Sequence, residues 1–462
     1  MIEKMFKLKE NNTNVKTEVI AGITTFITMA YIIFVNPGIL GMAGMNAAGA
    51  LGDEALAYNA FNDPVVGAVM TATILSAAIT TIIMGLYANY PFGLASGMGL
   101  NAYFTFGVVI GMGYTWQSAL GAVFVSGIVF ILITVTGIRE AIVNAIPLSL
   151  KNAISAGIGM FIALIGFTNA GIIVGDPDTT IALGELTDPN VLLAVIGFAV
   201  IAVLMARRVR GAMLLGIIIT TIIGIPLGVV VIPEGFTPFS MPPSLAPTFA
   251  QLNLKSLFDL SAGATLFDAM VAFFGIVMAF TYVDLFDTIG TVIGTATKAK
   301  MLDEDGKLPK MNKVLLTDAI GTCIGAVLGT STVTTYVESA AGIAEGGKTG
   351  LTAVVTGILF LAALFIAPIA GLVPGSATAP ALIIVGVLMM ESIVDIDFSD
   401  FTEALPAFMA IAVMPFSYSI ANGIAAGLVF YPIVKIVSGR SKEVHPIVYV
   451  LAILFIIRFA TF

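Results

Sequence analysis

The chain has almost none of the side chains that build disulfides or metal sites. Of its 462 residues, one is a cysteine, Cys323, and one is a histidine, His445. A single cysteine excludes an intramolecular disulfide, and a single histidine cannot build a multi-histidine metal centre. We therefore expect no metal site and no cofactor. His445, which lies beside a proline in a charged segment, is interpreted as a loop residue rather than a proton relay.

Charged residues are also scarce. They make up 10% of the chain, whereas hydrophobic residues make up 58%. An ordinary soluble protein is about 25% charged, so the composition predicts an all-α polytopic membrane protein. The length allows about fourteen spans of roughly 20 residues each. The net charge of -8 offers no basic footprint for nucleic acid, and membrane lipid is the expected surrounding.

The distribution of basic residues orients the predicted spans. The lysine-bearing N-terminus, the turn 207–210, the loop 298–313 and the region 435–442 fall on one side if about fourteen spans alternate. By the positive-inside rule this side is cytoplasmic, which predicts a multi-pass protein of the cytoplasmic membrane with a cytoplasmic N-terminus. The proline-rich loop 233–263 falls on the other side. The last apolar stretch, 447–462, is short, and we expect it to lie at the interface rather than to span.

The two halves of the chain share an order of elements. Residues 27–31 (ITMAY) match residues 276–280 (IVMAF), and residues 126–130 match residues 356–360. Seven spans per half is an odd number, so the second half is expected to be inverted relative to the first. Inverted repeats with broken helices are typical of secondary transporters, whose sites lie near the middle of the membrane.

These observations predict four regions. The first repeat, segments 1–7, covers residues 1–232, and the extracellular or periplasmic loop covers residues 233–263. The second repeat, segments 8–14, covers residues 264–438. Residues 439–462 form a C-terminal basic turn and an apolar, interfacial helix.

Three spans contain a break. The first span is expected to be interrupted at 36–38, where asparagine, proline and glycine follow one another. In the third segment, residues 93–99 hold three glycines, which makes a poor helix interior and predicts extended backbone before a short helix from Asn101. In the tenth segment, residues 330–335 are β-branched and polar, which favours a strand before a short helix that carries Glu338. Both short helices would aim their N–H groups at a common centre that suits a polar ligand.

Carboxylates inside the predicted spans are few. Asp284 and Asp287 lie on one helix face near the middle of the eighth span, and Glu338 lies in the tenth segment. A charge at the middle of a bilayer costs about 3 kcal/mol or more, so these residues are functional candidates. Burial favours their protonated form. One carboxylate that binds a substrate and another that exchanges a proton would make a workable symporter, and the alternative is that they only bridge helices. Asp318 and Glu345 lie nearer span ends and are expected to face water.

Three further residues are candidates for the same centre. Asn101 either contacts a ligand or caps its short helix. Thr28, on the first span, either lines the site or bonds back to its own helix. Tyr336 either stacks on a flat ring or packs in the core.

Four strings carry a resemblance to a known family. They are NPGIL, GMGLNAYF, FDTIGT and GTSTVTTYVESAAGIAEGGKTG, which begin at residues 36, 97, 286 and 329. They resemble the nucleobase:cation symporter 2 superfamily, within it the AzgA-like branch, and most closely the bacterial guanine/hypoxanthine permeases. The likeness runs from about residue 16 to residue 446. The glutamine-histidine pair of the uracil, xanthine and ascorbate branch is absent from the first span.

The resemblance implies a fold and a function. It implies proton-coupled purine uptake by a fourteen-helix protein, with a core of segments 1–4 and 8–11 and a gate of the remainder. It also implies a short strand plus a short helix in segments 3 and 10, and a possible homodimer. By motif position, Asn101, Asp284 and Glu338 resemble purine-binding residues, and Asp287 resembles a second aspartate needed for transport. Glu338 is also a candidate for proton coupling.

The chemistry of the bases ranks the substrates. Guanine and hypoxanthine present an N1–H, and guanine adds a 2-amino group beside it, so a carboxylate can accept from both as a fork. Adenine lacks the N1–H and is ranked second. An anion transporter or channel of related fold would want basic residues at the middle of the membrane, and none is visible there. An intramembrane aspartyl protease needs aspartates on different helices, so no enzymatic activity is expected.

Overall fold

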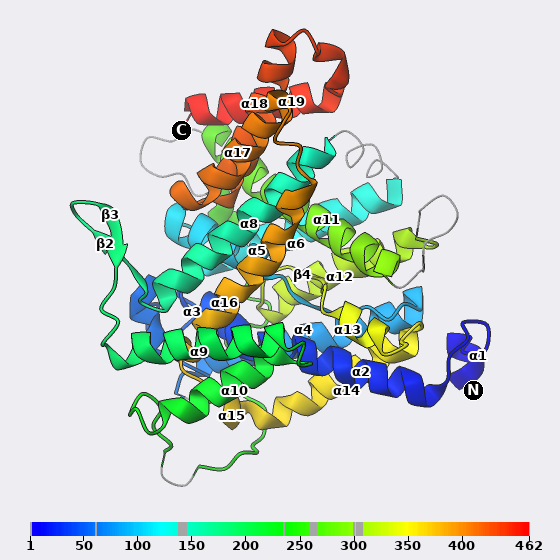
Figure 1. The fold of residues 1–462 in the computed structure, drawn as a ribbon, viewed down its shortest axis with the longest axis vertical. Helices are drawn as coiled ribbons and strands as arrows, with labels where there is room; N and C mark the ends of the chain where they lie inside the picture. The colour runs from blue at the N-terminus through cyan, green and yellow to red at the C-terminus, as the bar shows by residue number, and fades with distance from the viewer. Residues whose placement is uncertain are drawn as a thin grey trace.

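The computed structural model describes residues 2–60, 62–136, 146–233, 236–258, 266–298, 301 and 308–461. Most of these residues are helical, and two small sheets of two strands each are present among them (Figure 1). Parts of the predicted loops 233–263 and 298–313 lie outside the described residues.

The first half of the chain supplies helices and three short strands. In chain order they are α1 (Ile2–Phe6), α2 (Val15–Met29), α3 (Ile32–Gly41), α4 (Pro64–Ile83), β1 (Leu94–Ser96), α5 (Met98–Ala102), α6 (Trp116–Thr136), α8 (Leu148–Asn169), β2 (Ile173–Asp176), β3 (Thr180–Leu183), α9 (Pro189–Ala206) and α10 (Ala212–Gly224). The helix α5 continues into a wider, π-helical stretch, Tyr103–Gly111.

The second half repeats the helix-rich pattern and adds one strand. Its elements are α11 (Leu266–Lys298), α12 (Met311–Leu328), β4 (Val333–Thr335), α13 (Ser339–Ala344), α14 (Gly350–Ala363), α15 (Ala367–Gly371), α16 (Gly375–Met389), α17 (Phe401–Phe416), α18 (Ile420–Val437) and α19 (Pro446–Thr461).

Many of these helices can cross a membrane. Ten helical stretches among the described residues are long and apolar enough to do so. Three shorter apolar helices span Met98–Gly111, Ala212–Gly224 and Phe401–Phe416. A helical, polytopic membrane protein is therefore confirmed, and the number fourteen stays a prediction. The C-terminal helix α19 packs against α18, and whether it spans also stays a prediction.

The first span breaks at a different place from the one predicted. The helix α3 runs through Pro37 to Gly41, so the interruption expected at 36–38 is wrong. The break lies instead between α2 and α3, where Ile33 N–H donates to Ala30 O at 3.2 Å and Phe34 N–H to Tyr31 O at 3.0 Å. These tight turns reorient the chain at Tyr31. A proline is tolerated inside a membrane helix where neighbouring groups satisfy the freed backbone.

The strands β1 and β4 meet in the interior of the protein. They pair antiparallel, with Leu94 opposite Thr335 and Ser96 opposite Val333, and all six strand residues are buried. The pairing extends beyond the strands, because Gly97 N–H donates to Thr332 O and Tyr336 N–H donates to Gly93 O, both at 2.9 Å. A short helix follows each strand, so the predicted strand before each short helix is confirmed. Each helix starts at a different residue from the one expected: α5 begins at Met98 and α13 at Ser339.

The helices form two groups by their packing. The first, here called the strand-centred group, holds the pair β1–β4 together with α2, α3, α4, α6, α11, α12, α13 and α14. The second, here called the outer group, is made of α8, α9, α10, α16, α17 and α18. Close backbone contact joins helices within the outer group: a Cβ at Gly386 of α16 would lie 2.5 Å from Gly159 O of α8. Small residues permit such close approach between membrane helices.

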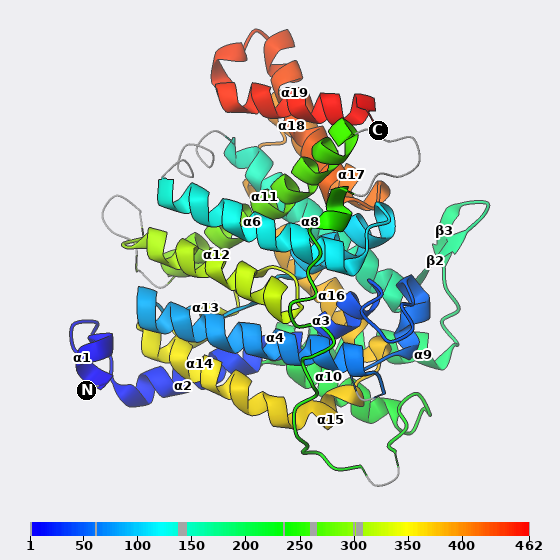
Figure 2. The ribbon, with the colours of Figure 1, turned by 180° about the vertical axis from the view of Figure 1, so that it is seen from behind.

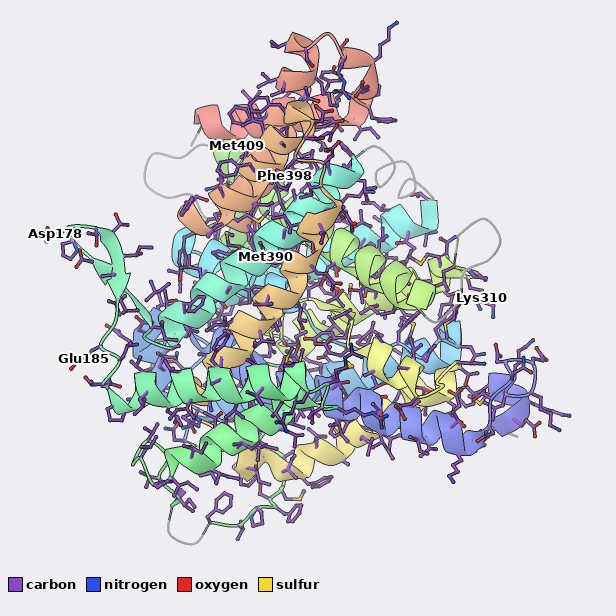
Figure 3. The ribbon with its side chains drawn as sticks, in the orientation of Figure 1. Asp178, Glu185, Lys310, Met390, Phe398 and Met409 are labelled. Atoms are coloured by element: carbon purple, nitrogen blue, oxygen red, sulfur yellow. The ribbon has the colours of Figure 1, made fainter. Side chains whose placement is uncertain are left out.

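Two acidic residues and one lysine mark opposite sides of the molecule. Figure 3 shows Asp178 and Glu185, at the hairpin β2–β3 and the chain after it, on one side of the molecule, and Lys310 on the opposite side. The described part of the long loop, 236–258, crosses the helices as an extended strip between α10 and α11 (Figure 2). It is attached to the strand-centred group, since Ala250 N–H donates to Val327 O at 2.7 Å and Asn253 N–H to Gln117 O at 2.9 Å.

A buried glutamate joins the start of the first span to α14. Glu18 is fully buried on α2. Its carboxylate accepts from Lys348 N at 3.0 Å, Thr349 N at 3.3 Å and Thr352 Oγ1 at 2.6 Å. The first N–H groups of a helix have no partner within it, so Glu18 supplies from another helix what an N-cap residue usually supplies.

We expect Glu18→Ala to destabilise the protein by about 2 kcal/mol, because the backbone donors at the start of α14 would stay buried without an acceptor. The measurement is the thermal unfolding midpoint of the detergent-solubilised protein. The matched control is Glu10→Ala, which removes an exposed carboxylate paired with Lys7 and should leave the midpoint unchanged. Equal midpoints for the two variants would contradict the assigned role of Glu18.

Candidate functional site

The predicted site residues lie on elements that touch one another. Asn101 lies on α5 and Glu338 directly precedes α13, so each belongs to one of the short helices that follow the paired strands. Asp284 and Asp287 lie on α11, which packs against β4, α5 and α13. The pairing of β1 with β4 therefore brings segments more than 200 residues apart in the sequence to one buried place.

The first span reaches Glu338 through two side chains. The hydroxyl of Tyr31 donates to Glu338 Oε1 at 2.7 Å. The hydroxyl of Thr28 lies 3.4 Å from Glu338 O, and it also contacts Thr25 O at 2.9 Å and Thr24 O at 3.1 Å. Thr28 thus lies beside Glu338, and its hydroxyl is also bonded back to its own helix, which is the alternative that the sequence left open. Whether it lines a ligand site stays a prediction.

Asn101 lies inside its helix rather than at its start. The N-cap position of α5 is Gly97, and Asn101 N–H donates to Gly97 O at 2.8 Å, so the interpretation of Asn101 as a cap is wrong. The side chain is fully buried. Its Oδ1 accepts from the hydroxyl of Ser331, and its Nδ2 lies 4.0 Å from Met98 Sδ. Because a thioether only accepts, the amide nitrogen faces Met98 and the oxygen faces Ser331.

The two aspartates of α11 have different surroundings. Asp284 is 2% exposed, and its Oδ2 accepts from the hydroxyl of Thr322 at 3.2 Å. Thr322 also lies 3.2 Å from Val333 O, so Asp284 is linked to β4 through one side chain. Asp287 is half-buried, and among the described residues no hydrogen bond holds its side chain. One member of the pair is therefore tied to the scaffold and the other is not.

Tyr336 ties the two strands together. It is buried, and its hydroxyl donates to Ser96 O at the end of β1. The hydroxyl is thus committed to the backbone. Whether the ring stacks on a ligand stays a prediction.

The expectation that Asp318 and Glu345 face water is wrong for Asp318, whereas Glu345 is partly exposed. Asp318 is fully buried on α12, and its Oδ1 accepts from Thr335 N at 2.9 Å and from Thr335 Oγ1 at 3.1 Å. It satisfies the outer edge of β4, which pairs with β1 on its other edge only. Glu345 is only 21% exposed at its side chain and forms an ion pair with Arg210.

Asn36 is a buried polar residue near the strand pair whose role could not be predicted from the sequence. It is fully buried, and its amide donates to Thr73 Oγ1 at 2.6 Å and to Thr330 Oγ1 at 2.9 Å. Thr330 lies 2.9 Å from Ser96 Oγ. The only signal in the sequence was a polar residue at the expected break of the first span. Its partners could not be named because they lie on two other segments, α4 and the chain just before β4.

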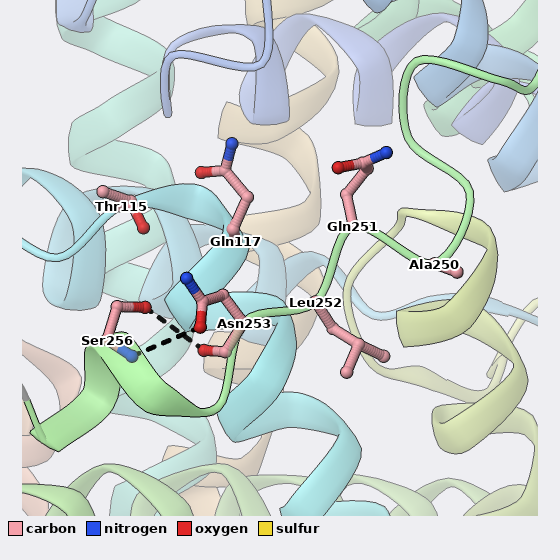
Figure 4. A pocket seen from close by; sticks show the side chains of 7 residues that line it. All are labelled: Thr115, Gln117, Ala250, Gln251, Leu252, Asn253 and Ser256. Atoms are coloured by element: carbon pink, nitrogen blue, oxygen red, sulfur yellow. Dashed lines mark hydrogen bonds between the residues drawn. The ribbon is translucent and has the colours of Figure 1, made fainter.

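Two cavities lie away from the carboxylates. One of about 530 Å³ opens between the start of α6 and the loop residues 250–256, and its walls carry the amides of Gln117, Gln251 and Asn253 (Figure 4). The other, of about 610 Å³, lies against the residues before α4 and the loop residues 236–244. Neither is lined by Asp284, Asp287 or Glu338. Among the described residues, no three His, Cys, Asp or Glu side chains are grouped so that they could hold a metal ion.

The chain is similar to known permeases over almost its whole length. Residues 16–426 match the family model Xan_ur_permease, a permease family. A putative permease of Methanocaldococcus jannaschii is 51% identical, with 99% of this chain and 98% of that protein covered. The adenine permease AdeP of Escherichia coli is 44% identical, with 99% and 96% covered. The guanine/hypoxanthine permease PbuG of Bacillus subtilis is 44% identical, with 99% of each chain covered.

Solved structures share the fold. The transmembrane domain of the cyanobacterial bicarbonate transporter BicA superposes with a TM-score of 0.59 at 15% identity, and covers 90% of this chain and 97% of that one. The anion transporter Slc26a9 of mouse, in its inward-facing state, superposes with a TM-score of 0.58 at 10% identity, and covers 91% of this chain and 68% of that one. At these identities the likeness extends to the fold alone.

Proposed function

This chain belongs to the permease family of the nucleobase:cation symporter 2 type, and on that premise we propose that it carries purine nucleobases across the cytoplasmic membrane together with protons. It is a transporter and not an enzyme, as its relatives are named permeases. The observation that carries the proposal is that Asn101, Asp284 and Glu338 lie on or beside elements that pack around the buried strand pair. Polar groups placed there at a high energetic cost are expected to serve a ligand.

The proposed substrates are 6-oxopurines, with guanine and hypoxanthine before adenine. The named relatives include permeases of both kinds, so they do not rank the bases. The ranking rests on chemistry: the carboxylate of Glu338 can accept N1–H of either 6-oxopurine, and the 2-amino group of guanine as well. Adenine, the second candidate, offers no N1–H.

The roles of the site residues are proposed from the resemblance, and one structural observation supports them. Glu338 and Asp284 are proposed to bind the base, with Asn101, Thr28 and Tyr336 around it. Asp287 is proposed to exchange the proton, with Glu338 also taking part. The absence of any hydrogen bond to the Asp287 side chain from the described residues supports the leading role of Asp287, because fixed donors favour the ionised form of a carboxylate. Glu338, which accepts from Tyr31, is proposed as the lesser partner in proton exchange.

The proposed architecture is alternating access by two units. Segments 1–4 and 8–11 would form the core and the rest the gate, in two inverted repeats at 1–232 and 264–438 with fourteen spans in total. The strand-centred and outer groups support this division, since the packing separates the helices in the same way. We place the N-terminus, the turn 207–210 and Lys310 in the cytoplasm. A homodimer is proposed from the resemblance alone.

Uptake by purified protein in proteoliposomes tests the function. We expect labelled hypoxanthine to accumulate when the inside is alkaline relative to the outside and not when the pH is equal, because proton entry supplies the driving force. Unlabelled guanine should compete more strongly than adenine. Uptake that ignores the pH gradient would refute proton coupling, and strong competition by adenine alone would overturn the ranking of substrates.

Substitutions at the carboxylates separate binding from coupling. We expect Glu338→Gln and Asp284→Asn to abolish binding of labelled hypoxanthine to the solubilised protein. The reason is that an uncharged amide cannot form the charge-assisted hydrogen bond that a carboxylate forms with N1–H. We expect Asp287→Asn to keep the dissociation constant for hypoxanthine within about threefold of the wild type, because Asp287 is not proposed to bond to the base. The same variant should lose accumulation, because it cannot exchange the proton. Full accumulation by the Asp287 variant would rule out the proton role.

An ion pair joins the strand-centred group to the outer group on the side that is proposed to be cytoplasmic. Arg210, in the turn between α9 and α10, pairs with Glu345 directly after α13. The next residue of the turn, Gly211, lies against α2, where an added Cβ would be 2.4 Å from Ile27 Cγ2. In the proposed cycle this contact closes the cytoplasmic side and has to open on each turnover.

Charge reversal at this pair is expected to change the rate of uptake. Arg210→Glu should alter the initial rate up to about fivefold, because an exposed ion pair contributes about 0.2–1 kcal/mol and repulsion reverses it. Combining Arg210→Glu with Glu345→Arg should restore the rate. Arg207→Glu makes the same charge change in the same turn, without an ion pair to lose among the described residues, and serves as the control. Failure of the double variant to recover would argue against this contact as a gate.

A further inference from the structure

Tyr31 stands at the one bend that divides the first span. It lies between the end of α2 at Met29 and the start of α3 at Ile32, and the turn at this point is held by Phe34 N–H donating to Tyr31 O at 3.0 Å. Its side chain is 1% exposed. The bend therefore lies where the buried ring of Tyr31 packs inside the strand-centred group.

The hydroxyl of Tyr31 meets a carboxylate. A buried tyrosine O–H needs an acceptor, and here the acceptor is Glu338 Oε1 at 2.7 Å. Tyr31 and Glu338 are 307 residues apart in the chain. The bond is charge-assisted when the carboxylate is ionised, and such bonds are about twice as strong as neutral ones.

One further hydrogen bond to this carboxylate comes from the backbone N–H of Glu338 itself. Glu338 occupies the residue before α13, and its side chain makes no capping bond to the helix that follows. Within the described residues, Tyr31 is the side chain that donates to it. A glutamate has three side-chain torsions, and holding one oxygen at a fixed point removes much of the freedom that they allow.

We propose that Tyr31 is a positioning residue that orients the Glu338 carboxylate so that it recognises two adjacent N–H groups of a purine, and thereby sets the preference for guanine over hypoxanthine. This rests on the proposed function. Guanine would use both oxygens in parallel, which requires a fixed carboxylate plane. Hypoxanthine has N1–H without the neighbouring amino group. It therefore donates a single hydrogen bond, which can persist when the carboxylate of Glu338 rotates.

Tyr31→Phe tests the proposal, because it keeps the ring and removes the hydroxyl. We expect the KM for guanine to rise roughly tenfold and that for hypoxanthine less than about threefold, with Vmax per folded transporter retained. A purely structural role would lower the amount of folded protein, and hence Vmax, without changing the ratio of the two KM values. Tyr90→Phe, which removes a hydroxyl bonded to Pro309 O outside the proposed site, is the control and should keep the ratio of the wild type.

A second variant, Glu338→Asp, tests the same contact from its other end and does not require Tyr31→Phe to fold. Glu338→Asp retains the charge but is one methylene too short to reach the hydroxyl, so it should lose the guanine preference to the same extent. In the Glu338→Asp background, Tyr31→Phe should change the ratio no further. Where uptake is slow, the ratio of dissociation constants from thermal shift of the solubilised protein replaces the KM ratio.

The outcomes separate this inference from the function beneath it. Wild-type protein that takes up neither base would overturn the proposed function. Wild-type protein that takes up both, with Tyr31→Phe and Glu338→Asp each retaining the wild-type ratio, would overturn the role of Tyr31 alone.

Discussion

The rest of the structure depends on how the broken segments satisfy their backbone inside the membrane. No water is available there, so each N–H and C=O that leaves a helix needs a partner in the protein. The pairing of β1 with β4 supplies hydrogen-bond partners along one edge of each strand, and side chains of the flanking helices supply partners along the other edge. Thr81 of α4 bonds both N–H and C=O of Leu94, at 2.9 and 3.0 Å. Asp318 and Thr322 of α12 serve β4 in the same way. A two-stranded sheet that would be marginal alone is thereby held by α4 and α12, one helix from each half of the chain.

The same bonds that complete the strands also hold the residues proposed to bind the base. Thr322 contacts both Val333 O and Asp284, so one hydroxyl serves the scaffold and the site. Ser331 lies two residues before β4 begins, and its hydroxyl donates a hydrogen bond to Asn101 Oδ1. Such sharing means that the orientations of Asp284 and Asn101 are set by the scaffold before a ligand arrives, which lowers the ordering cost of binding. Asp287, which among the described residues stands outside these bonds, is the carboxylate proposed to change its charge.

Much of this arrangement could be read from local features of the sequence, and the rest depends on contacts between distant segments. Glycines near residue 97 and β-branched residues near 333 signalled the strands because backbone preference is local. Asp284, Asp287 and Glu338 stood out because a carboxylate in an apolar run is costly wherever it points. Asp318 was misjudged, since the N–H that it satisfies exists only after β4 forms. Tyr31 gave no signal at all: a tyrosine in a membrane span is ordinary until its partner, 307 residues away, is known.

The distribution of strong and weak contacts bears on motion. Within the strand-centred group, Asp318, Thr322 and Glu18 make buried hydrogen bonds that would leave unsatisfied groups if they broke. Between the two groups, the pair Arg210–Glu345 is partly open to water, with the arginine side chain 65% exposed. An exposed ion pair can exchange its partner for water at a cost of about 1 kcal/mol or less, whereas a buried one cannot. The structure is thus expected to part along the boundary between the groups before it loosens within either, so that the carboxylates and the strand pair would move as one body past the outer helices.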